Sequence, residues 1–197
     1  DDLVRQGKVT YVGFSEWTAE QIARGLKIQD KRGYNRFVSS QPQYSALWRV
    51  IEAEVVPLSE REGIGQIVWS PMAQGVLTGK YLPGKKAPAG SRATDKKSGA
   101  AMISRWMKDD VLEAVQLLKP IAESVDLSMS QMALAWVLQN PNISSAIMGA
   151  TKPAQIKDNV KASGVKLPPE VMKAIDGAIG KVAERDPKKN VSPNPRP

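Results

Sequence analysis

The chain has 197 residues, of which 42% are apolar, and this is enough to bury a core. It contains no cysteine, which excludes disulfides, thiolate catalysis, zinc fingers and iron–sulfur clusters and fits a cytoplasmic protein. The net charge of +8 favours anionic partners in general, and no apolar run is long enough to span a membrane.

Four short runs of apolar, β-branched or aromatic residues predict strands, each bounded by glycine, proline or polar residues. They cover residues 9–14, 37–41, 65–69 and 144–148. Helical patterns lie between them and after the last one. Three helices are expected at 19–30 after a Thr18 cap, at 52–62 before Gly63, and at 110–124. Three more are expected after a Ser130 cap, at 153–163, and after residues 168–169.

The connection after the third predicted strand begins with a basic loop at 83–99, rich in glycine and proline, which we expect to be mobile. Its charge suits a lid over a dinucleotide, a nucleic-acid contact or a merely solvated loop. Nucleic-acid binding is better supported by interleaved aromatic residues or a known module, and neither is visible, so we expect no nucleic-acid partner. The proline-rich tail at 186–197 is expected to be extended or disordered.

Alternating strands and helices predict right-handed βαβ units and a parallel sheet, hence an α/β fold. The sheet can either close into a barrel or stay open and doubly wound, because both arrangements cover its faces. No G-x-G-x-x-G motif follows a predicted strand, so the phosphate-binding turn of the Rossmann fold is missing.

The carboxyl ends of parallel strands are where binding groups gather. Here these ends carry Ser15, Gln41, Trp69, Ser70 and the segment 149–152. Amide and hydroxyl groups beside an indole suit an aromatic ligand that bears an amide. The helix that follows 149–152 offers backbone N–H groups and Lys152 to a phosphate. Judged alone, Trp69 would be a packing residue.

Four segments carry a family resemblance: residues 7–15 (GKVTYVGFS), 41–45 (QPQYS), 69–81 (WSPMAQGVLTGKY) and 147–159 (IMGATKPAQIKDN). In this order they resemble the fifth to eighth strand motifs of the aldo-keto reductases, in the branch that also includes the potassium-channel β subunits. The resemblance implies a parallel (β/α)8 TIM barrel, of which residues 1–185 would be the C-terminal half. The missing N-terminal half, or self-association, would then complete the sheet.

The resemblance also implies a nicotinamide cofactor and assigns its contacts. Ser15 and Gln41 would bind the carboxamide, and Trp69 would stack on the nicotinamide ring. The loop at the pyrophosphate would be lined by Ser70, Met72, Gln74, Leu77 and Lys80. The adenosine end would be held by Gly149, Thr151, Lys152, Gln155, Asp158 and Asn159.

Two positions depart from the family's pattern. Glu16 stands where an Asn commonly follows the strand-five serine, and Gln155 stands where many members that prefer NADP have Arg. Lys152 can still meet a 2′-phosphate, so we expect NADPH, with NADH as the alternative.

The family's catalytic Asp, Tyr, Lys and His come from the first four strands, whose motifs are not in this sequence. We therefore assign no catalytic residue, and we expect no metal site. The resemblance implies an oxidoreductase that reduces small aldehydes or ketones to alcohols in its full-length form, with this chain inactive alone. The alternatives are a non-catalytic, nucleotide-sensing regulatory subunit and a generic basic binding module.

Overall fold

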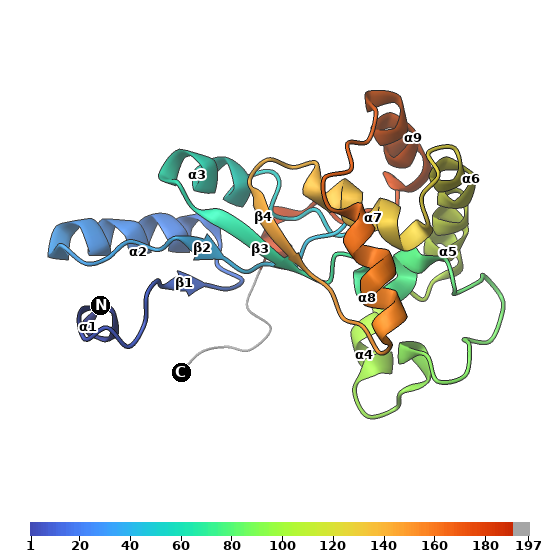
Figure 1. The fold of residues 1–197 in the computed structure, drawn as a ribbon, viewed down its shortest axis with the longest axis horizontal. Coiled ribbons are helices and arrows are strands. Elements are labelled where there is room, and N and C mark those ends of the chain that lie inside the picture. The colour runs from blue at the N-terminus through green and yellow to red at the C-terminus, as the bar shows by residue number, and fades with distance from the viewer. Residues whose placement is uncertain (191–197) are drawn as a thin grey trace.

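A computed structural model describes residues 1–190, which form a four-stranded parallel sheet in the order β1-β2-β3-β4 (Figure 1). The strands are β1 (Gly13–Phe14), β2 (Ser39–Ser40), β3 (Gly65–Trp69) and β4 (Ile143–Ile147). The four predicted strands and their parallel pairing are confirmed. The first two strands are shorter than expected, although the Val38 N–H still donates to the Val12 carbonyl at 3.0 Å.

Helices connect and follow these strands. The α-helices are α1 (Asp2–Arg5), α2 (Ala19–Arg32), α3 (Val55–Glu62), α4 (Gly99–Ile103), α5 (Asp109–Gln116), α6 (Leu118–Glu123), α7 (Met129–Leu138), α8 (Pro153–Asn159) and α9 (Pro169–Ile179). Short 3-10 helices are η1 (Ala73–Thr78), η2 (Arg92–Thr94), η3 (Ser104–Trp106), η4 (Val160–Ala162) and η5 (Pro187–Lys189).

The helix ends confirm some predicted boundaries and correct others. Thr18 caps α2 as predicted, and Gly63 ends α3 in the left-handed conformation. The predicted Ser130 cap is wrong, because Ser128 caps α7 and exchanges hydrogen bonds with Gln131. The helix predicted at 110–124 is split into α5 and α6, since Pro120 lacks the N–H that would continue the ladder.

The sheet has one face under helices, as Figure 1 shows for α3 above β3. Helix α3 packs against β3, and α7 packs against β4. Phe14 and Val68 are buried on this face. The other face carries small residues in register, namely Gly13, Ser39 and Gly65.

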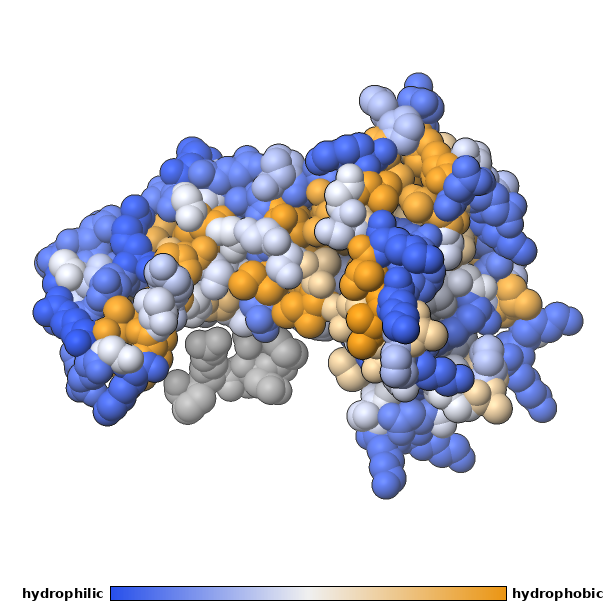
Figure 2. All heavy atoms as spheres, in the orientation of Figure 1, coloured by the Kyte–Doolittle hydropathy of each residue, from blue (hydrophilic) through white to orange (hydrophobic). Residues whose placement is uncertain are grey.

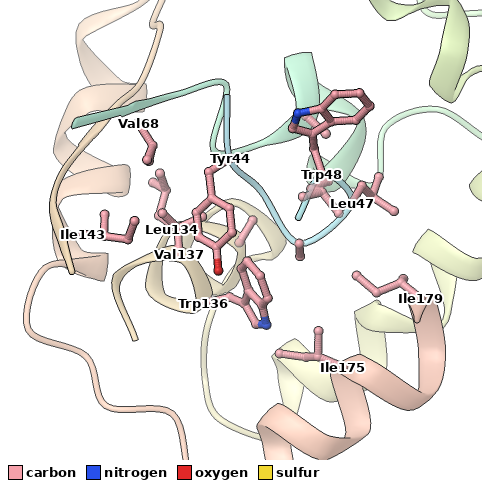
Figure 3. Packing of buried hydrophobic residues seen from close by; sticks show 14 of the residues in the cluster. Tyr44, Leu47, Trp48, Val68, Leu134, Trp136, Val137, Ile143, Ile175 and Ile179 are labelled. Atoms are coloured by element: carbon pink, nitrogen blue, oxygen red, sulfur yellow. The ribbon is translucent and has the colours of Figure 1, made fainter. Parts of the chain in front are cut away.

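The core is centred on α7 and the loop that follows β2. Figure 3 shows the Trp136 indole between Tyr44 and the α9 residue Ile175. The rings of Tyr44 and Trp136 have centroids 5.4 Å apart, and the Arg49 guanidinium lies 4.5 Å from the Trp136 ring. Arg49 is buried and pairs with Asp176 at 2.6 Å, so α9 is tied to this loop.

Residues 186–190 differ from the extended tail that the sequence predicts. They include the turn η5, and Asn190 is buried, with its amide donating to the Trp17 carbonyl at 2.8 Å. Just before them, Glu184 makes a parallel β-bridge with Trp48. These contacts dock the segment on the loops after β1 and β2, while residues 191–197 of the predicted tail lie outside the described residues.

Replacing Gly13 with alanine should destabilise the sheet, because an added Cβ would lie 2.6 Å from the Ser39 backbone oxygen. The strands β1 and β2 would have to separate, which costs about 1 to 3 kcal/mol for overpacking of this kind. Gly177→Ala is the matched control, since nothing lies within 4 Å of the Cβ that it adds in α9. Urea unfolding of both variants tests this, and equal stabilities would contradict it.

Candidate functional site

A cleft of about 540 Å³ lies between the segment that follows β3 and the segment that follows β4. These two strands are neighbours, so the segments at their carboxyl ends meet although they are far apart in the sequence. The cleft wall contains ten of the fourteen residues that the resemblance assigns to cofactor binding: Trp69, Ser70, Met72, Gln74, Lys80, Gly149, Thr151, Gln155, Asp158 and Asn159.

The wall that follows β3 is a tight bend. Ser70 and Gln74 both have positive φ, 56° and 60°, and so does Ala73, an uncommon conformation for residues other than glycine. The Gln74 amide donates to the Ser70 hydroxyl, which closes the bend on itself. Gly75 continues the bend at φ 95°, and the end of the Lys80 side chain lies close to this glycine. The bend therefore forms one wall of the cleft, with the Lys80 ammonium group at its end.

The wall that follows β4 is organised by Gln155. Its side-chain oxygen accepts the backbone N–H of Thr151 at 2.7 Å and that of Lys152 at 3.2 Å. These two N–H groups are therefore already paired, and a phosphate could take them only if Gln155 moved. Asp158 is also held, since its carboxylate accepts the Gln131 amide at 2.8 Å.

Four of the predicted residues do not line this cleft. Ser15 and Gln41 lie together at the ends of β1 and β2, where the Ser15 hydroxyl donates to the Gln41 carbonyl at 2.7 Å. Leu77 is buried in the core beneath the bend, with 1% of its surface exposed. Lys152 is exposed at the start of α8, outside the cleft wall.

Arg92 is a residue of the cleft wall that the sequence did not single out. It lines the cleft together with Gly90, and both belong to the basic loop 83–99. The charge of that loop was the available signal, but no motif singled out one cation. The loop thus borders the cleft, whereas its mobility and its role as a lid stay predictions.

The edge of the Trp69 indole is held by a carboxylate. Its N–H donates to Glu16 at 2.8 Å, and the same Glu16 oxygen accepts the Gln43 backbone N–H at 2.6 Å. Burial raises the pKa of Glu16, and the hydrogen bonds from Gln43 and Trp69 oppose that shift. The carboxylate that departs from the family's pattern therefore contacts the Trp69 indole.

Tyr44, in the loop that follows β2, is not positioned to act on a ligand. It is buried, and its hydroxyl donates to Glu52 at 2.8 Å. Burial, followed by the charge of Glu52, raises the pKa of Tyr44 above its ordinary value. Within residues 1–190, no group of three or more acidic side chains could hold a metal ion, and no helix could cross a membrane.

Glu16→Gln should change how stability depends on pH. The folded protein binds the Glu16 proton more tightly than the unfolded chain does, whose pKa lies near the ordinary value of 4.5. The stability that Glu16 contributes is therefore fully present below that value and is lost as pH rises through the raised pKa. Glutamine does not titrate and keeps an oxygen acceptor.

Urea unfolding of both proteins between roughly pH 4 and pH 8 tests this expectation. The free energy of unfolding of the wild type should fall relative to that of Glu16→Gln as pH rises. Parallel curves over the whole range would show that the pKa of Glu16 is the same in both states.

Known proteins share much of their sequence with this chain. The Aldo/keto reductase family model matches residues 1–179. The chain is 40% identical over 180 residues to a probable voltage-gated potassium channel subunit beta of Oryza sativa subsp. japonica, covering 90% of this chain and 54% of that protein. It is 36% identical over 172 residues to protein tas of Escherichia coli (strain K12), covering 87% and 48% of the two chains.

A third relative is the uncharacterized oxidoreductase YrpG of Bacillus subtilis (strain 168), 33% identical over 173 residues, or 88% of this chain and 50% of that protein. The chain thus spans about half the length of the curated relatives that it matches. From the family match and these relatives, we conclude that the chain belongs to the aldo/keto reductase family.

Proposed function

We propose that this chain is the cofactor-binding part of an NADPH-dependent oxidoreductase that reduces aldehydes or ketones to alcohols. The observation that carries the proposal is the cleft between the segments after β3 and β4, where ten of the fourteen expected cofactor residues meet. Its volume of about 540 Å³ is in the usual range for sites that bind small molecules and cofactors. Bound there, the dinucleotide would supply a hydride to a carbonyl carbon.

The groups of the cleft fit a dinucleotide. Trp69 offers a flat aromatic face, while Lys80 and Arg92 offer positive charge for phosphates. Ser15 and Gln41, beside each other at the neighbouring strand ends, offer hydroxyl and amide groups for a carboxamide. NADPH carries one phosphate more than NADH, and the two cations of the wall together with Lys152 favour it.

The open edges of the sheet support the proposal that this chain is part of a larger assembly. Strands β1 and β4 each pair on one side only within residues 1–190, and Ile147 of β4 is 43% exposed. Figure 2 shows apolar side chains at the surface over the region of β4 and α8. Because the family implies a (β/α)8 barrel, we propose that these strands are the fifth to eighth. The other four, with the catalytic groups, would come from the remaining half or from a second copy.

A nucleotide-sensing regulatory subunit is the second candidate. The relative from Oryza sativa subsp. japonica bears the name of a probable voltage-gated potassium channel subunit beta. In such a protein the bound dinucleotide would report the redox state of the cell, and rapid turnover would be unnecessary.

Binding and turnover of the full-length protein test the two candidates. NADPH and NADH are titrated by calorimetry, and oxidation of NADPH is then followed with a panel of aldehydes and ketones. Binding with turnover supports the reductase, and binding without turnover supports the sensor. If neither dinucleotide binds at millimolar concentration, both proposals fall.

A further inference from the structure

One carboxylate oxygen of Glu16 connects three segments at the carboxyl ends of the strands. Glu16 follows β1, Gln43 follows β2 and Trp69 ends β3. The Glu16 oxygen accepts the Gln43 backbone N–H at 2.6 Å and the Trp69 indole N–H at 2.8 Å. Glu16 is 9% exposed and has no ion-pair partner within residues 1–190. It accepts both of its hydrogen bonds from neutral donors.

The backbone of Glu16 is unusual in a way that matches this arrangement. Its φ is 56°, the left-handed region that residues with a Cβ seldom adopt. Such conformations persist where surrounding contacts hold them, and they gather at functional sites. From this backbone conformation the Glu16 side chain accepts its two hydrogen bonds.

Trp69 is fixed in two ways. Its backbone N–H donates to the Pro42 carbonyl at 3.0 Å, and its carbonyl accepts the Tyr44 N–H at 3.2 Å, so the main chain is set by the segment after β2. These bonds leave the torsions of the side chain free. The hydrogen bond from the indole N–H to Glu16 restricts them, while the ring still lines the cleft.

We propose that Glu16 is a positioning residue that holds the Trp69 indole plane in the orientation that a cofactor ring requires. The proposal deepens the proposed function and rests on it, because it takes Trp69 as the platform for the nicotinamide. A ring that is already oriented loses less conformational freedom when a ligand stacks on it. Glu16 acts through Trp69, and its carboxylate has no part in the chemistry.

Three variants separate this role from a merely structural one. Glu16→Leu removes both hydrogen bonds, and Glu16→Gln is the matched control because its side-chain oxygen can accept both. Trp69→Phe keeps an aromatic ring but removes the indole N–H. If Glu16 acts through that N–H, Glu16→Leu should weaken NADPH binding about three- to tenfold in the wild-type background. In the Trp69→Phe background it should have little further effect.

The experiment measures the Trp69 indole signal by NMR and NADPH affinity by calorimetry, both on the full-length protein. The five tryptophans of this chain each give an indole signal, and the signal of the full-length protein that disappears in Trp69→Phe belongs to Trp69. We expect Glu16→Leu to shift this signal and to weaken binding, and Glu16→Gln to restore both. If Glu16→Leu does not fold, Glu16→Asp replaces it, since the shorter side chain keeps the charge but loses reach.

The outcomes distinguish the two proposals. If the wild type fails to bind NADPH, the proposed function falls, and the indole signal alone decides whether Glu16 orients Trp69. An indole signal that Glu16→Leu leaves unchanged overturns the positioning role. Equal losses of affinity from Glu16→Leu with and without Trp69→Phe also overturn it, because Glu16 would then act independently of the indole.

Discussion

Replacing Trp136 with alanine is expected to lower the free energy of unfolding by about 3 to 5 kcal/mol, as for other large aromatic residues in protein cores. Trp136 is 4% exposed on α7, and its ring packs against Tyr44. The Arg49 guanidinium stacks on the same ring, and one of its nitrogens has no hydrogen-bond partner among the described residues. Losing the indole would leave a cavity and remove the stacking partner of a buried cation.

Trp136→Phe is the control for that prediction. The indole N–H of Trp136 is buried and has no partner within the described residues, so phenylalanine loses no hydrogen bond. It keeps an aromatic face for Arg49 and fills part of the volume. Chemical unfolding of both variants should give a clearly smaller loss for phenylalanine. A loss of equal size would show that the ring is not the source of the stability.

The β/α order of the fold could be predicted because it depends on local patterns. Strand residues cluster between turn signals. Thr18 marks a helix start through its side-chain hydroxyl, and Gly63 marks a helix end through its left-handed backbone. A helix boundary was harder to predict where two nearby residues could both cap the helix. Ser128 and Ser130 both suit a helix start, and only Ser128 has Gln131 at the third helical position.

The candidate site could be predicted where it follows strand ends and could not where it depends on distant contacts. Trp69 and Gly149 were found because they end neighbouring parallel strands in segments that resemble a known family. Arg92 reaches the cleft through an irregular loop, whose path no periodicity specifies. The bond from Trp69 to Glu16 joins residues 53 positions apart, so it exists only once the sheet has formed.

The docking of residues 184–190 was missed for the same reason. Prolines and charges are typical of a solvated tail, and nothing in the local sequence shows that Asn190 will donate to Trp17. The β-bridge between Glu184 and Trp48 likewise depends on the loop after β2 being in place. Local composition predicts the tendency of a segment, whereas a partner far away in the chain decides its structure.

Replacing Trp69 with alanine is expected to weaken NADPH binding by roughly 5- to 150-fold, which corresponds to the loss of about 1 to 3 kcal/mol for stacking of a heterocycle on an aromatic side chain. The indole lines the cleft and is half-buried, so a ligand ring can cover its exposed part. Alanine would also leave the Glu16 oxygen with the Gln43 N–H as its one remaining donor. Fluorescence or calorimetric titration of the full-length protein measures the change.

The control for this last prediction is a tryptophan that lies outside the cleft. Trp17 stacks on Phe14 with ring centroids 4.9 Å apart and does not line the cleft, so Trp17→Phe should leave NADPH affinity close to that of the wild type. Thermal unfolding of each variant shows whether a loss of binding reflects a loss of folded protein. If Trp69→Ala folds normally and binds NADPH as tightly as Trp17→Phe does, the ring is a packing residue. The cofactor must then contact other groups of the cleft, and Glu16 has no platform to orient.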